Sequence, residues 1–218
     1  MPAETVLLLP GTASDEVFVR SVFTEPLSQV GAVLDAPRVR TLGERLTALE
    51  NAPAGHPIVV GGVSLGAHVA ARWAVANPDR CAGLILALPA WTGAPEEAPA
   101  ALAARASAEI VRTQGLTTAL AGTTGWLHDE LKRAWRGYGD QLVPHLEEAA
   151  ESLAPTLDEL KSLDVPTGIV GCADDPVHPI AVARAWAEAI PRAVLVTTTL
   201  DAYPRALGRA VQAWQRAR

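Results

Sequence analysis

The sequence predicts an α/β protein built on a mostly parallel, doubly wound sheet of about six strands, with a helical insertion that forms a lid. Short apolar runs recur along the chain. These runs are continuous, as in strands buried on both faces, whereas half-buried strands alternate apolar and polar residues. Stretches with helical spacing separate these runs, which favours parallel strands joined by crossover helices. One long stretch, 91–164, offers helices but no strong strand. We therefore expect residues 1–90 and 165–218 to form the core of one domain, and residues 91–164 to form the insertion.

The first half of the chain alternates strands and helices. An apolar run at 5–9 predicts a first buried strand, and the small residues at 10–14 predict a loop after it. Helical spacing over 16–30 predicts a helix that Pro26 bends or ends, because proline cannot donate the backbone hydrogen bond. The same reasoning predicts a strand at 32–36, a helix at 42–49 and a strand at 58–61.

The second half adds the insertion and the remaining strands, which are predicted at 84–88, 167–171 and 193–198, with a closing helix at 204–216. Within the insertion, helices are predicted at 99–113, 116–120, 127–136 and 140–152. Ligands of open α/β sheets bind at the carboxyl ends of the strands, and the insertion leaves the sheet from such an end. Trp91 and Trp126 are therefore candidates for binding a substrate beneath the insertion. The alternative for its apolar side chains is that they pack the insertion onto the body.

Composition and charge exclude several classes of protein. The formal charge of −6 and the absence of a lysine and arginine cluster argue against a nucleic-acid surface. No apolar stretch is long enough to span a membrane, and the run 6–9 lacks the basic segment of a signal peptide before it. Cys81 and Cys172 have no metal-binding spacing, so two reduced thiols and a cytoplasmic location are expected. We expect a small-molecule substrate, no nucleic acid, no membrane and no cofactor, and a homodimer is left open.

The most informative motif is the pentapeptide Gly62-Val63-Ser64-Leu65-Gly66. It follows a predicted strand and leads into a helical stretch. A serine on such a sharp turn has a strained backbone, and its hydroxyl is pushed above the edge of the sheet. The flanking glycines allow the tight turn and the close approach of neighbouring elements. We interpret Ser64 as a candidate nucleophile; the alternative is an incidental serine in a glycine-rich loop.

With these features the chain resembles the α/β-hydrolase superfamily over essentially its whole length. The pentapeptide resembles the family's nucleophile elbow, and Pro10-Gly11-Thr12 stands where the family often has His-Gly after its first long strand. The loop 171–179 resembles the loop that carries the catalytic acid, and residues 155–167 resemble the approach to its strand. The closing helix also matches. The resemblance implies the α/β-hydrolase fold and a serine followed by an acid, but it names no substrate.

The resemblance also implies donors for the oxyanion of an acyl-transfer reaction. The backbone N–H of Leu65, directly after the serine, would be one donor. The second would be the N–H of Thr12 or of its neighbour Ala13. The hydroxyls of Thr12 and Ser14 could add a bond, and their alternative role is to cap the helix that follows.

Two adjacent aspartates, Asp174 and Asp175, are candidates for the acid. Asp174 has the family's usual spacing from Gly171, and Asp175 has the usual spacing to Pro179. We prefer Asp175, because Pro179 marks where the next helix begins. The other aspartate would then form a turn within the loop.

The base is the missing part of the pattern. The family places its histidine in the loop after the last strand, yet 199–204 contains none and no histidine follows His178. His178 shares the loop of the candidate acid, so it is a candidate for a relocated base, with a histidine of the insertion as second choice. The alternative is that His178 only packs in its loop. Surface or packing roles are expected for the others: His56, His68, His128 and His145. Asp174, Asp175 and His178 have no distant fourth partner, so we expect no metal site.

Three functions remain open from the sequence. The first is a serine hydrolase that acts on a small ester, thioester or activated amide through Ser64. The second is a non-hydrolytic enzyme on the same fold, of lyase, cyclase or isomerase type, because the usual histidine is absent. The third is a catalytically silent binding protein, for the same reason. A distance between Ser64 and each histidine would discriminate among them.

Overall fold

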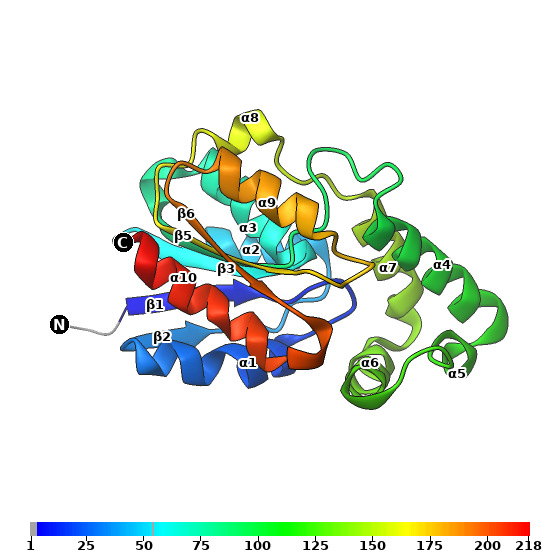
Figure 1. Cartoon of the computed structure of the whole chain (residues 1–218). Helices are drawn as coiled ribbons and strands as arrows, with labels where there is room; N and C mark the ends of the chain where they lie inside the picture. The colour runs from blue at the N-terminus through cyan, green and yellow to red at the C-terminus, as the bar shows by residue number, and fades with distance from the viewer. Residues whose placement is uncertain (1–3, 54) are drawn as a thin grey trace.

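The computed structural model describes residues 4–53 and 55–218, and it contains a sheet of six parallel strands (Figure 1). The strand order is β2-β1-β3-β4-β5-β6. The strands are β1 (Glu4–Leu9), β2 (Ala32–Asp35), β3 (Ile58–Val63), β4 (Cys81–Ala87), β5 (Thr167–Cys172) and β6 (Ala193–Thr198). The central strands β3 and β5 are buried along their whole length, as their continuous apolar runs require. The predicted fold class is confirmed.

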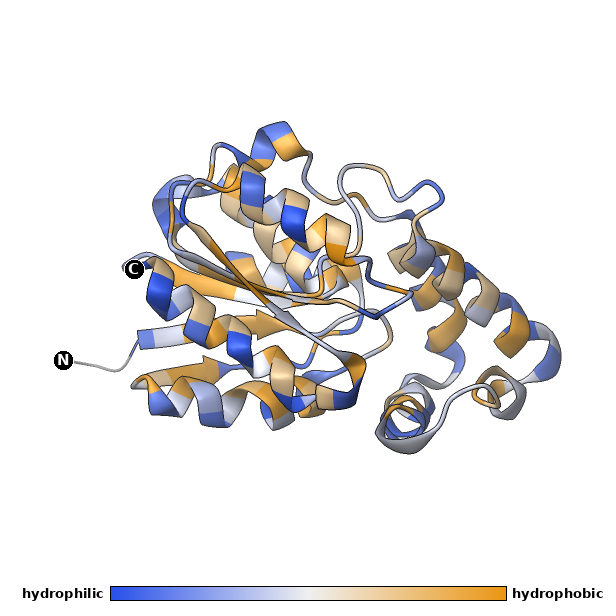
Figure 2. Cartoon of the chain, in the orientation of Figure 1, coloured by the Kyte–Doolittle hydropathy of each residue, from blue (hydrophilic) through white to orange (hydrophobic). Residues whose placement is uncertain are grey.

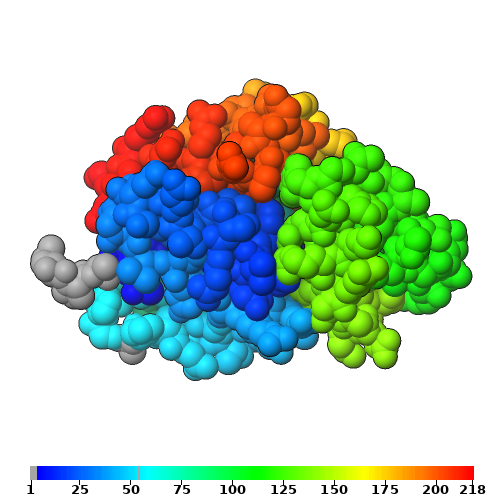
Figure 3. Space-filling view, turned by 90° about the horizontal axis from the view of Figure 1, so that it is seen from below, coloured from blue at the N-terminus to red at the C-terminus, as the bar shows by residue number. Residues whose placement is uncertain are grey.

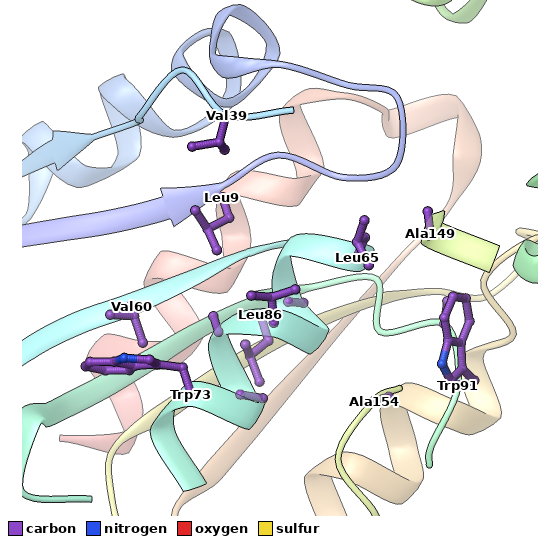
Figure 4. Packing of buried hydrophobic residues seen from close by; sticks show 14 of the residues in the cluster. Leu9, Val39, Val60, Leu65, Trp73, Leu86, Trp91, Ala149 and Ala154 are labelled. Carbon is purple, nitrogen blue, oxygen red and sulfur yellow. The ribbon is translucent and has the colours of Figure 1, made fainter. Parts of the chain in front are cut away.

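Helices cover both faces of the sheet. On one face lie α1 (Glu16–Gln29) and α10 (Arg209–Ala217), and on the other lie α2 (Leu42–Glu50), α3 (Leu65–Ala76) and α9 (Ile180–Ala189) (Figure 1). Two buried apolar clusters follow from this arrangement, one on each face. Figure 2 shows the apolar strands between helices whose outer surfaces are hydrophilic. Figure 4 shows part of the larger cluster, where Trp73 packs near Val60 below the sheet.

The order of the strands creates one switch point, between β1 and β3. The chain leaves β1 through α1 toward β2, and it leaves β3 through α3 toward β4 on the opposite face. The loops after β1 and β3 therefore diverge at the carboxyl end of the sheet. Such a divergence opens the crevice in which open α/β sheets bind ligands.

A helical insertion joins β4 to β5. It comprises α4 (Pro99–Gln114), α5 (Leu116–Ala119), α6 (Gly125–Tyr138) and α7 (Leu142–Glu151), and the short α8 (Leu157–Leu160) follows it. Helices α4 and α7 pack against each other. Figure 3 shows the insertion as a separate lobe beside the N-terminal part of the chain. Figure 1 places it beyond the carboxyl end of β1.

Several predicted boundaries differ from those observed. Helix α1 continues through Pro26 to Gln29, so the proline does not end it. Strand β4 begins at Cys81, three residues before the predicted start, because Cys81 pairs with Ile58. The predicted closing helix at 204–216 begins as a 3-10 turn (Arg205–Gly208) and becomes α-helical only from Arg209. Among the described residues, no helix has both the length and the apolarity to cross a membrane.

Candidate active site

Ser64 lies on the sharp turn between β3 and α3. Its backbone has φ 52° and ψ −114°, a strained conformation for a residue with a side chain. Neighbouring backbone leaves no room for side chains beside it, since a Cβ on Gly62 or on Gly66 would lie 2.4 Å from the carbonyl oxygen of Leu9. The glycines of the pentapeptide therefore allow the turn to pack onto the end of β1. Ser64 itself is buried, with 8% of its surface exposed.

The loop after β1 runs directly beside the serine. A Cβ on Gly11 would lie 3.5 Å from the Cβ of Ser64, so the backbone of this loop touches the turn. Thr12 follows, half-buried, and Ala13 is fully buried with φ 51°. Leu65 is the first residue of α3, where N–H groups have no acceptor within the helix. The residues proposed as oxyanion donors thus lie on the two segments that flank Ser64.

Asp175 and His178 form a hydrogen-bonded series with Ser64. His178 lies three residues after Asp175 in the loop that follows β5, and its Nδ1 is 2.9 Å from Asp175 Oδ2. The other ring nitrogen, Nε2, is 3.0 Å from the hydroxyl oxygen of Ser64. The N–H groups of Val177 and His178 both donate to Asp175 Oδ1, at 2.8 and 3.2 Å. One short loop therefore brings a carboxylate and an imidazole to the serine.

The surroundings favour a charged carboxylate at Asp175. Burial alone would raise its pKa, but the hydrogen bond from His178, the charge of His178 and the backbone N–H groups of Val177 and His178 hold the pKa below its ordinary value. The Asp175 side chain is 7% exposed. An ionised carboxylate at Oδ2 accepts the proton of His178 Nδ1, which leaves the lone pair of Nε2 facing the Ser64 hydroxyl.

Asp174 has a different set of partners. Its Oδ1 accepts the backbone N–H of Leu200 at 2.8 Å and the thiol of Cys172 at 3.1 Å. The side chain is exposed, and these bonds hold its pKa below the ordinary value. Asp174 thus joins the loop after β5 to the loop after β6, where the family would carry its histidine.

The side chains of the remaining histidines have other partners or surroundings. His68, one turn into α3, is fully buried, and its Nε2 accepts the backbone N–H of Ala90 at 2.9 Å. His128 pairs with Thr123, at 3.0 Å. His145 is 3% exposed and stacks on Tyr138. His56 is exposed, just before β3. Each of the four has the packing or surface placement expected from the sequence.

The two tryptophans proposed to bind substrate have different surroundings. Trp91 is buried: its indole N–H donates to the carbonyl of Ser152 at 3.2 Å and its ring contacts His68. Figure 4 shows Trp91 within the buried cluster that includes Ala149 and Ala154 of the insertion. Its placement favours packing of the insertion over contact with a ligand. Trp126, at the start of α6, is 37% exposed and lies against Phe18 of α1 and Tyr203.

Arg45 did not stand out in the sequence. Its side chain is fully buried under the loop after β1, with hydrogen bonds to the carbonyls of Pro10 and Gly11. The available signal was its position, because Leu42, Arg45 and Leu49 share one face of α2 by their i, i+3, i+7 spacing. A charged residue within an apolar stripe indicates a buried polar contact.

A hydroxyl, an imidazole and a carboxylate in series are the groups that acyl transfer through a serine requires. The imidazole can take the proton of Ser64, and the carboxylate can stabilise the imidazolium that forms. In the described part of the chain, no group of three or more histidine, cysteine, aspartate or glutamate side chains could hold a metal ion.

Comparison with known proteins identifies a family for nearly the whole chain. The family described as "Alpha/beta hydrolase family" matches residues 6–216. A search among curated proteins finds no match.

Solved structures match at low sequence identity. A thermophilic esterase from Thermogutta terrifontis is 20% identical, with a TM-score of 0.70, and the match covers 98% of this chain and 89% of that one. A hydrolase from Pseudomonas aeruginosa is 18% identical, with a TM-score of 0.73 and coverage of 98% and 90%. A carboxylesterase structure from Nitrososphaera gargenis is 14% identical, with a TM-score of 0.71 and coverage of 91% and 82%. At these identities the likeness establishes the fold alone.

Proposed function

Because the chain belongs to the alpha/beta hydrolase family, we propose that it is a serine hydrolase whose nucleophile is Ser64, whose base is His178 and whose acid is Asp175. The observation that carries the proposal is the unbroken series of hydrogen bonds from Asp175 Oδ2 through His178 to Ser64 Oγ, at 2.9 and 3.0 Å. These distances fall within the range that a general base needs.

In the proposed reaction, Ser64 Oγ attacks the carbonyl carbon of an ester or thioester while His178 Nε2 takes the hydroxyl proton. Asp175 stabilises the imidazolium that forms. The carbonyl oxygen becomes an oxyanion, bound by the N–H of Leu65 and by an N–H of the loop after β1. The bond to the leaving group then breaks, and His178 returns its proton to that group. Water, activated by the same imidazole, releases the acid from Ser64.

The substrate class proposed is a small acyl ester or thioester. The support is that Ser64 is only 8% exposed, which restricts the room for an acyl group beside it. We propose further that residues 91–164 act as a lid over this site. Solved esterases share the fold with this chain, which is consistent with the proposal.

The non-hydrolytic and silent alternatives were motivated by the absence of a histidine after the last strand. The distance of 3.0 Å between His178 Nε2 and Ser64 Oγ supports the hydrolase over both alternatives.

The first test is covalent labelling of the purified protein with a fluorophosphonate probe, followed by hydrolysis of p-nitrophenyl acetate. We expect one adduct on Ser64, located by mass spectrometry, and loss of both labelling and hydrolysis in Ser64→Ala. Removing a member of a triad typically lowers kcat by about 10⁴-fold or more. A Ser64→Ala variant that hydrolyses the ester at the normal rate would falsify the proposal.

A further inference from the structure

Arg45 places a guanidinium group inside the protein, directly beneath the loop that flanks Ser64. The whole residue is 0% exposed. Its Nη2 donates to the carbonyl of Gly11 at 3.0 Å, and its Nε lies 3.4 Å from the carbonyl of Pro10. Nη1 donates to the carbonyl of Arg40. All three contacts are therefore to backbone carbonyls, two of them in the loop after β1.

No carboxylate of the described residues forms an ion pair with this guanidinium. Glu44 and Glu148 lie on elements nearby, but they bind backbone N–H groups at Arg40 and Leu42. A buried charge without a counter-ion is costly, and apolar replacements for buried ions are often neutral or stabilising. Stability alone is therefore a weak reason to place an arginine here.

The contact with Gly11 fixes the direction of the next N–H group. The Gly11 carbonyl and the Thr12 N–H belong to one peptide unit, and the described part of the chain has a cis peptide only before Pro204. In a planar trans peptide the C=O and N–H bonds point in opposite directions. Arg45 holds the carbonyl side of this unit, so the N–H of Thr12 points away from Arg45.

Gly11, the first residue of this peptide unit, lies against the turn of the nucleophile. A Cβ on Gly11 would be 3.5 Å from Ser64 Cβ and 3.1 Å from the carbonyl oxygen of Val63. The Gly11 carbonyl also accepts the N–H of Ser14 at 3.3 Å, which closes the loop into a turn. Tyr138 of the insertion donates its hydroxyl to the Ser14 carbonyl at 2.7 Å. Arg45 therefore binds the carbonyl of Gly11, and Tyr138 binds the carbonyl of Ser14 in the same loop.

We propose that Arg45 is a positioning residue for catalysis: it holds the Gly11–Thr12 peptide so that the Thr12 N–H becomes the second oxyanion donor. This inference rests on the proposed hydrolase function, and it selects Thr12 over Ala13. The positive charge on the carbonyl side also polarises the peptide, which strengthens its N–H as a donor. Both effects act on charge that appears only in the transition state.

The test compares Arg45→Met and Arg45→Lys with wild type and with the control Arg80→Met. Arg80 is a control because it also binds backbone carbonyls at the end of α2 and just after it, those of Glu50 and Ala52 at 3.0 and 3.3 Å, in addition to an ion pair with Glu50. It lies directly before β4, at the amino ends of the strands and away from Ser64. The measurements are kcat and KM for p-nitrophenyl acetate, the rate of Ser64 phosphonylation, and the thermal midpoint. All rates are referred to the folded fraction measured by circular dichroism.

For Arg45→Met we expect kcat and the phosphonylation rate to fall by about 10- to 100-fold with KM little changed, since direct loss of one oxyanion donor costs about 10²- to 10³-fold. Arg45→Lys retains the charge but not the fork of donors, so we expect a smaller loss in kcat. Arg80→Met should lower the thermal midpoint without changing kcat. If Arg45→Met does not fold, the loss of kcat at constant KM in Arg45→Lys is the deciding measurement.

The measurements distinguish a failure of the inference about Arg45 from a failure of the proposed hydrolase function. If wild type reacts with the probe at Ser64 but both Arg45 variants keep the wild-type kcat per folded molecule, Arg45 is only structural and the inference is wrong, while the proposed function stands. If wild type neither reacts with the probe nor hydrolyses any ester, the proposed function itself fails.

Discussion

A single loop supplies both partners that Ser64 needs. Asp175 and His178 lie three residues apart, and Asp175 uses Oδ1 to fix the loop backbone and Oδ2 to orient the imidazole. The acid and the base are therefore fixed to each other by contacts within one loop. The loop after β6 therefore does not need to supply a histidine. Asp174 joins the loop after β5 to this loop by accepting the N–H of Leu200.

The two adjacent aspartates allow a matched test of this assignment. In Asp175→Asn the amide cannot stabilise the imidazolium and favours the wrong tautomer of His178, so we expect kcat to fall by about 10³- to 10⁴-fold. In Asp174→Asn, which changes an exposed side chain outside the series, we expect kcat within about threefold of wild type, as is usual for surface changes. Steady-state hydrolysis of p-nitrophenyl acetate measures both. Equal losses in the two variants would show that the acid is wrongly assigned.

The sequence predicted some of these residues better than others. Ser64 could be predicted because the pentapeptide, the strand and the helix are local features, and Asp175 was preferred from its spacing to Pro179. The approach of His178 to Ser64 depends on how two loops 114 residues apart meet, which no local pattern encodes. Trp91 was expected near the substrate, but its large apolar ring is buried between His68 and the insertion.

At the scale of elements, the insertion is attached to the body near the site through α6. Arg133 forms a two-pronged ion pair with Asp15, at 2.6 and 2.7 Å, and Asp15 also caps α1 by accepting the N–H groups of Val17 and Phe18. Trp126, seven residues earlier on α6, stacks on Phe18 with ring centroids 6.4 Å apart. The cap of α1 and the attachment of α6 therefore share one carboxylate.

This shared carboxylate permits the two roles to be separated. Asp15→Ser keeps a capping oxygen but removes the ion pair, and Arg133→Met leaves the cap intact while it removes this ion pair together with the pair of Arg133 and Glu130 within α6. We expect both to lower the free energy of unfolding by no more than about 1 kcal/mol, because the pair is partly exposed, and both to increase hydrogen exchange in α6. Asp15→Ala loses the cap as well, which should add about 1 kcal/mol. Equal protection of α6 in wild type and Arg133→Met would contradict an attaching role for the pair.

Local sequence patterns predicted which helices and strands exist better than they predicted the first and last residues of each element. Apolar runs predicted all six strands. The reason is clearest for β3 and β5, which are buried along their whole length and have no polar side, whereas β2 and β6 are partly exposed. The start of β4 was misplaced because Gly83 interrupts the apolar run before Leu84, while Cys81 and Gly83 pair with Ile58 and Val59 of β3. Tertiary hydrogen bonds decide such ends, so sequence spacing leaves them open.

At the scale of the whole molecule, the strand order decides where the chemistry can lie. The switch point between β1 and β3 brings together the loop of Gly11 and the turn of Ser64, and β5 adds the loop of His178 on the far side of β4. The alternation of strands and helices predicted a mostly parallel, doubly wound sheet of about six strands, but it did not predict the order in which the strands lie. The insertion follows the carboxyl end of β4. Two histidines, His68 of α3 and His145 of α7, are buried.

These buried histidines should make stability depend on pH. Burial lowers the pKa of His145 from 6.5 to about 3, and the charges of Arg45 and Arg40 lower it in the same direction; Glu148, with Oε2 3.6 Å from Nδ1, is the acidic group nearby. Burial, with a further effect of the His178 charge, also lowers the pKa of His68 to about 3. Below pH 6.5 these histidines are protonated in the unfolded chain but stay neutral in the folded protein. Their full contribution to the free energy of unfolding is therefore present above pH 6.5, and it decreases as the pH falls below that value.

Each such histidine should cost about 1.4 kcal/mol per pH unit below its unfolded pKa, and thus about 2 kcal/mol at about pH 5. The lowered pKa values of Asp15 and Asp175 act only below the ordinary 3.8, so they do not contribute in this window. Urea unfolding at about pH 7.5 and about pH 5 measures the difference. We expect His145→Phe, whose ring can still stack on Tyr138, to reduce the loss by about 2 kcal/mol, and the exposed His56→Gln to leave it unchanged. If His145→Phe loses as much stability as wild type between these pH values, His145 is protonated in the folded state, and the contact between α7 and the body is more hydrated than its burial indicates.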